Sequence, residues 1–127
     1  MAEDVLVLTQ DETVRLDPDR LEQLYLRLGD AGADDVVCRA IEELAVRLSH
    51  TERLFRQGKA AEMRKSARSL VAISDQIGMR TLARVAGDVT RCIDAGDGVA
   101  LAAVLSRLIR IGERSLTAIW DTQGLRV

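Results

Sequence analysis

Aromatic residues are scarce in this sequence: they make up 2% of it, and Tyr25, Phe55 and Trp120 are the only three. The apolar content of 47% is carried instead by Leu, Ala and Val, which pack helices through aliphatic side chains. A large β-sandwich or barrel is therefore not expected. A length of 127 residues fits one helical domain, residues 1–127.

Residues that bind metals or carry redox chemistry are also few. The chain has one histidine, His50, and two cysteines, Cys38 and Cys92, which lie far apart in the sequence. A structural zinc site normally takes four such ligands. We therefore expect no metal and no cofactor, and two reduced thiols that pack within helices.

Long apolar runs are missing. No stretch approaches the roughly 18 uninterrupted apolar residues that a membrane span needs. The first ten residues, MAEDVLVLTQ, lack the basic start and the long apolar core of a secretory signal. We expect a cytoplasmic protein that has no membrane partner.

The net charge of −2 is small but unevenly distributed. Residues 1–58 hold 7 Arg and 13 Asp or Glu, a charge of −6, whereas residues 59–127 hold 11 Lys or Arg and 7 Asp or Glu, a charge of +4. Nucleic-acid-binding proteins usually present a strongly basic face. A mildly basic second half suits protein partners better, so we expect no nucleic-acid partner.

The sequence does have clear periodicity. Residues 4–16 alternate apolar and polar positions, which predicts an extended N-terminal segment over 1–16, with two short pieces that could form a hairpin. Asp17-Pro18 then reads as a helix N-cap followed by proline at the first helical position. Segment 30–34 is expected to be a turn, with Asp34 or Asp35 capping the next helix. The predicted helices span 18–28, 35–57, 59–76, 79–95 and 98–121.

Apolar residues recur on each long helix at spacings of three, four or seven, which gives every helix one inward stripe. The links between these helices are two or three residues long and contain glycine, so consecutive helices should pack antiparallel. The predicted fold class is all-α: an up-down antiparallel four-helix bundle over 17–121, with the helix 18–28 as a lid. The predicted inward residues are Val37, Ile41, Leu44, Leu48, Phe55, Met63, Ala67, Leu70, Ser74, Ile77, Leu82, Val85, Ala86, Val89, Ile93, Leu101, Leu105, Leu108, Ile109, Gly112, Leu116 and Ile119.

The third predicted helix, 59–76, carries a motif. Residues 68–78 read RSLVAISDQIG, in which Leu70, Ser74, Ile77 and Gly78 agree with the pattern H-x-L-K-G-S-[SA]-x-x-[IV]-G. This stretch resembles the phosphoacceptor helix of histidine phosphotransfer (HPt) domains, and the order of helices over about 18–121 is similar too. The resemblance implies a four-helix bundle in a two-component or phosphorelay system, with a response-regulator receiver domain or a histidine kinase as partner.

Other positions of this stretch depart from the HPt pattern. Arg68 stands where the family has its histidine, Val71 where it has lysine and Ala72 where it has the first glycine. A guanidinium stays protonated and is no nucleophile, so Arg68 cannot accept a phosphoryl group. The chain therefore looks like a pseudo-HPt protein, a non-catalytic adaptor and not an enzyme.

Helical geometry places Arg68 about 160° from the inward direction of Leu70, with Arg64, Ala72 and Asp75 nearby. Planar guanidinium groups bind carboxylates, and small side chains let a partner approach closely. We predict that Arg64, Arg68, Val71, Ala72 and Asp75 bind the partner, with the arginines at its acidic phosphorylation pocket. The competing interpretation is an ordinary solvated helix face.

Two alternatives remain open. His50 is the only residue able to carry phosphohistidine chemistry; we expect it to be exposed on the second predicted helix, either as a phosphotransfer site or as an ordinary surface histidine. The chain could instead be a self-associating structural bundle, a homodimer formed through the Val5–Leu8 segment as an edge strand or through an apolar helix face. The sequence offers no support for a serine hydrolase, a phosphate-binding loop or a di-metal site.

Overall fold

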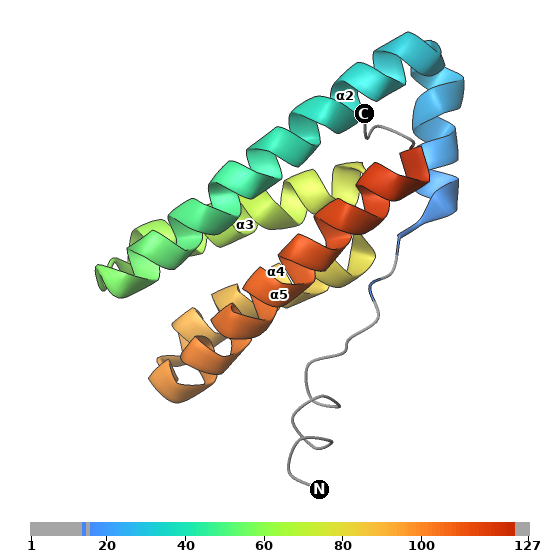
Figure 1. Ribbon diagram of the computed structural model, residues 1–127. Helices are drawn as coiled ribbons and strands as arrows, with labels where there is room; N and C mark the ends of the chain where they lie inside the picture. The colour runs from blue at the N-terminus through green and yellow to red at the C-terminus, as the bar shows by residue number, and fades with distance from the viewer. Residues whose placement is uncertain (1–13, 15, 124–127) are drawn as a thin grey trace, which may run out of the picture.

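Four α-helices make up most of the chain that the computed structural model describes, which comprises residue 14 and residues 16–123. Consecutive helices run antiparallel and pack against one another (Figure 1). The predicted all-α fold with four packed helices is confirmed. The helices are α2 (Pro18–Arg56), α3 (Ala60–Gln76), α4 (Arg80–Ala95) and α5 (Gly98–Gln123).

The start of α2 follows the predicted capping chemistry. The side chain of Asp17 accepts hydrogen bonds from the backbone N–H groups of Asp19 (3.1 Å) and Arg20 (3.3 Å), and Pro18 occupies the first turn. Most of the predicted extended segment lies outside the described residues. Within them, Leu16 forms an isolated antiparallel bridge with Met79.

A break at Gly29 divides α2, but the predicted turn over 30–34 is wrong. Gly29 has φ +75 and ψ 170, which ends the predicted short helix as expected, yet helix resumes directly after it. Asp34 does not cap a helix; its carboxylate instead accepts a hydrogen bond from the Tyr25 hydroxyl across the break. Burial raises the pKa of the Tyr25 phenol, and the hydrogen bond to Asp34 raises it further, by a smaller amount. The turn prediction was wrong because Gly29 alone takes the non-helical conformation, so that residues 30–34 already belong to the next helical segment.

The core lies on the predicted stripes, with small rotations. All five residues predicted inward on α3 and its C-terminal cap are buried. On α2, α4 and α5, some predicted core positions are only half-buried, and on α2 and α5 neighbouring residues take the interior. The half-buried ones are Ile41, Phe55, Ile93, Leu101, Ile109 and Leu116, and the buried residues not predicted include Thr51, Leu54, Ile111 and Ser115.

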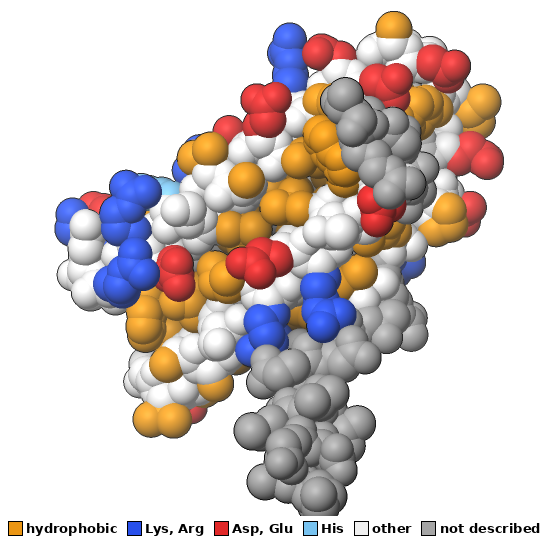
Figure 2. Space-filling view, viewed as in Figure 1, with side chains coloured by type: hydrophobic (Ala, Val, Ile, Leu, Met, Phe, Trp, Pro, Cys, Tyr) orange, Lys and Arg blue, Asp and Glu red, His pale blue; other side chains and the backbone are white. Residues whose placement is uncertain are grey.

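The helix pairs are not packed equally closely. Contact is most extensive between α3 and α4. Among the helix pairs that touch, it is least extensive between α2 and α5. Apolar side chains are visible along the seam between α2 and α5 (Figure 2). One hollow of about 480 Å³ lies along this seam and includes Phe55, Leu105 and Ile109 in its lining.

The junction of α3 and α4 fits tightly against the start of α2. Gly78 has φ +78, its carbonyl accepts a 2.7 Å hydrogen bond from the Asp17 N–H, and a Cβ at this position would lie 2.9 Å from the Asp17 carbonyl oxygen. Any side chain here would meet both backbone strain and a backbone atom. The final glycine of the HPt-like motif therefore has a structural role in this chain.

Candidate docking surface on α3 and α4

The motif helix α3 separates its residues into two faces. Leu70 and Ser74 have no exposed surface, and neither does Ile77 directly after the helix. Arg68 and Ala72 are exposed on the other side. Because a helix turns about 100° per residue, positions 68, 72 and 75 share one face.

Arg64, the first residue of the predicted strip, has a partner within the chain. Its Nε donates to Asp94 Oδ1 at 2.7 Å and its Nη2 to Asp94 Oδ2 at 3.0 Å, so the pair is bidentate and joins α3 to α4. The hydrogen bonds from Arg64 lower the pKa of the Asp94 carboxyl, and the same bonds raise the pKa of Arg64. The sequence reasoning did not foresee Asp94, since its position beside Arg64 depends on how α3 and α4 align.

Arg68 differs from Arg64. Its side chain makes no hydrogen bond or ion pair within the described part of the chain. It lies close enough to Asp94 for its positive charge to help lower the pKa of that carboxyl, although the hydrogen bond from Arg64 has the larger effect. The Arg68 guanidinium therefore keeps its donors for solvent or a partner.

A hollow of about 370 Å³ lies between α3 and α4 beside this face. Its lining comes from both helices: Val71 and Asp75 on α3, and Arg80, Ala83 and Arg84 on α4. Val71 is half-buried and Ala83 is buried, while the three charged residues are exposed. The structure thus brings the predicted residues Val71 and Asp75 together with residues of α4 that sequence reasoning did not name.

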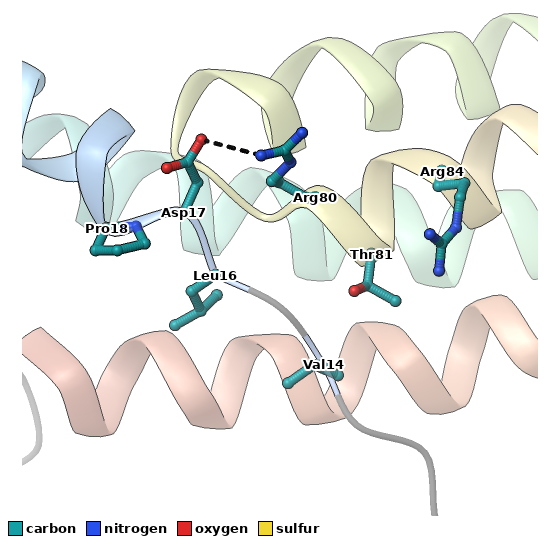
Figure 3. Close-up of a pocket in the computed structure, with 7 residues that line it drawn as sticks. All are labelled: Val14, Leu16, Asp17, Pro18, Arg80, Thr81 and Arg84. Carbon is teal, nitrogen blue, oxygen red and sulfur yellow. Dashed lines mark ion pairs between the residues drawn. The ribbon is translucent and has the colours of Figure 1, made fainter.

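A second hollow, of about 490 Å³, lies on the other side of Arg80 and Arg84. It is lined by Val14, Leu16, Asp17, Pro18, Arg80, Thr81 and Arg84 (Figure 3). In this hollow Arg80 Nη1 lies 3.8 Å from Asp17 Oδ2, whereas the Arg84 side chain lies apart from that pair. Arg84 therefore borders both hollows.

The remaining candidates are isolated residues. His50 lies on α2 and is half-buried, not fully exposed as expected. Cys38 and Cys92 are free, half-buried thiols. Within the described ranges, no group of three or more His, Cys, Asp or Glu side chains is placed to hold a metal ion.

None of the described helices is long and apolar enough to span a membrane. Comparisons of the chain with protein families, with curated proteins and with solved structures found no match. Any statement about activity or partner therefore depends on the residues of the site itself.

Proposed function

We propose that this protein is a non-catalytic signalling adaptor of the pseudo-HPt type, which binds a receiver domain or a histidine kinase without accepting phosphate. The observation that carries the proposal is Arg68: an exposed guanidinium with no ion pair among the described residues, at the phosphoacceptor position of an HPt-like helix. Exposed Ala72, one turn further, leaves room for a partner's backbone.

The chemistry of a receiver domain suits this surface. Its phosphorylation pocket is acidic, and a guanidinium binds carboxylates through two parallel hydrogen bonds. Arg68 is the better anchor of the two predicted arginines, because Arg64 would first have to leave Asp94. Arg64 then has mainly a positioning role, joining α3 to α4.

The proposal is tested by binding and by phosphorylation. Truncating one partner of a desolvated Arg–carboxylate contact costs about 2–5 kcal/mol, while a solvated charge at the rim costs less than about 1 kcal/mol. Arg68→Ala should therefore weaken receiver binding, measured by titration calorimetry, by the larger amount. Incubation with a phosphorylated receiver or an active histidine kinase should leave no stable phosphoryl group on the chain.

Two results would favour the alternatives. Acid-labile phosphate that appears on the chain and is lost in a His50→Ala variant would support a phosphotransfer protein that uses His50. A parent chain that binds no receiver or kinase but sediments as a dimer would support the self-associating bundle. The half-buried apolar residues along the α2–α5 hollow, Phe55 and Ile109 among them, are the feature that favours this second alternative.

A further inference from the structure

The arginines on the α3–α4 side of the bundle fall into two groups. Three have a carboxylate partner: Arg64 pairs with Asp94, Arg80 with Asp17 and Arg91 with Asp88. Arg68 on α3 and Arg84 on α4 form no hydrogen bond or ion pair within the described residues. An arginine without a partner can bind an incoming carboxylate without first giving up one of its own.

These two arginines flank one surface. Arg84 lines the hollow between α3 and α4 together with Val71, and Arg68 is three residues before Val71, about one helical turn away. Val71 and Ala83 are the apolar residues in the lining of this hollow, and its other lining residues are charged. Such a surface has an apolar centre with cations on two sides, which suits a partner that offers separated acidic groups.

The charge of this surface is positive. Arg80 is paired with Asp17, so its charge is balanced. The other charges of the lining are Arg84 and Asp75, and Arg68 beside the hollow leaves an excess of one positive charge. Complementary charge of this kind guides the encounter of two proteins and fixes their relative orientation. An acidic partner is therefore favoured over a neutral or basic one.

We propose that the partner spans the seam between α3 and α4 and that Arg84 is its second anchor, binding a carboxylate separate from the one at Arg68. This inference rests on the proposed function and identifies the partner surface as an acidic face of a receiver domain, with carboxylates on both sides of the α3–α4 hollow. The HPt resemblance concerns the motif helix α3 and does not by itself imply that the partner contacts α4.

The experiment compares matched arginine variants against purified receiver domains from the organism's own response regulators. Arg84→Ala should raise the Kd by at least about thirtyfold, the change that corresponds to the low end of a desolvated charge contact. The control is Arg53→Ala, since Arg53 is an exposed α2 arginine that also has no ion pair within the described residues. It should change the Kd by less than about fivefold.

A conservative variant separates the shape of the side chain from its charge. Arg84→Lys keeps the positive charge but loses the planar fork, so its Kd should lie between those of the parent and Arg84→Ala. The association rate of the parent should also fall as salt is raised, and that dependence should weaken in Arg84→Ala. Thermal unfolding should be unchanged in both variants, because the side chain is exposed.

The outcomes distinguish the two proposals. If Arg68→Ala weakens binding while Arg84→Ala behaves like Arg53→Ala, the partner contacts α3 alone and the inference about α4 is wrong, while the proposed function stands. If a receiver binds and neither Arg68→Ala nor Arg84→Ala changes its Kd, the partner docks elsewhere and the inference about α4 is again overturned. If no receiver binds the parent chain, both proposals fail.

Discussion

On the inner face of α3, Met63, Ala67 and Leu70 have an exposed fraction of 1% or less, whereas Arg68 and Ala72 on the outer face are exposed. The inner residues are held by the core, so their size and polarity are set by folding. The outer residues have no such constraint from the fold. Their identity is therefore open to selection by a partner, and substitutions on the two faces should have effects of different kinds.

The largest effect is expected at the centre of the inner face. Leu70→Ala should lower the free energy of unfolding by about 2–5 kcal/mol, because it removes a fully buried side chain and leaves a cavity. Denaturant unfolding measures this change, provided the slope stays constant. Leu26→Ala, the same substitution at a residue that is 79% exposed, is the control and should change stability little. Equal losses at the two sites would contradict the assignment of faces.

The spacing of the apolar residues explains why the difference between the two faces of α3 could be predicted from the sequence. Repetition close to 3.6 residues places Met63, Ala67, Leu70 and Ser74 on one side of a helix whatever that helix packs against. The same periodicity, with the Asp17-Pro18 cap, predicts most of the helix boundaries. This information is local, so the fold class and the inner face of α3 follow from sequence.

The candidate surface could be predicted only in part, because pairings between helices are not local. Arg64 and Asp94 are 30 positions apart and meet through the alignment of α3 with α4. Arg84 borders two hollows that exist only once α3, residue 14 and residues 16–18 have packed against α4. The sequence predicted which way the α3 side chains point. Only the structure shows which arginines already have a carboxylate partner.

Replacing the polar residue Ser74 on the inner face of α3 should stabilise the protein, and by less than Leu70→Ala destabilises it. The Ser74 hydroxyl is buried and has no hydrogen-bond partner within the described residues. Burying an unsatisfied polar group costs about 1–3 kcal/mol, so Ser74→Ala should raise the free energy of unfolding, by about 1 kcal/mol after the small loss of packing. Chemical denaturation of the two proteins under one set of conditions measures the difference.

Ser66 provides the matched control for Ser74. It is also buried on α3, but its hydroxyl lies 2.7 Å from that of Thr51. Thr51 in turn donates to the carbonyl of Arg47, so Ser66 supplies the proton between the two hydroxyls. Ser66→Ala removes a satisfied bond and should destabilise the protein by about 1 kcal/mol. If both serine variants shifted stability in the same direction, hydrogen bonding would not be what distinguishes the two sites.

The smallest effect on stability is expected on the outer face, at Ala72. Ala72→Leu adds a large side chain to an exposed helical position, and both residues favour helix, so the free energy of unfolding should change by less than about 0.5 kcal/mol. The same side chain would occupy the space through which a partner's backbone approaches α3. Receiver binding should therefore be lost in Ala72→Leu, and also in Ala72→Arg, while circular dichroism and thermal unfolding match the parent. A variant that unfolded as readily as Leu70→Ala would show that position 72 faces the core. A variant that bound like the parent would instead place the partner away from α3, because no other surface of the bundle would be changed.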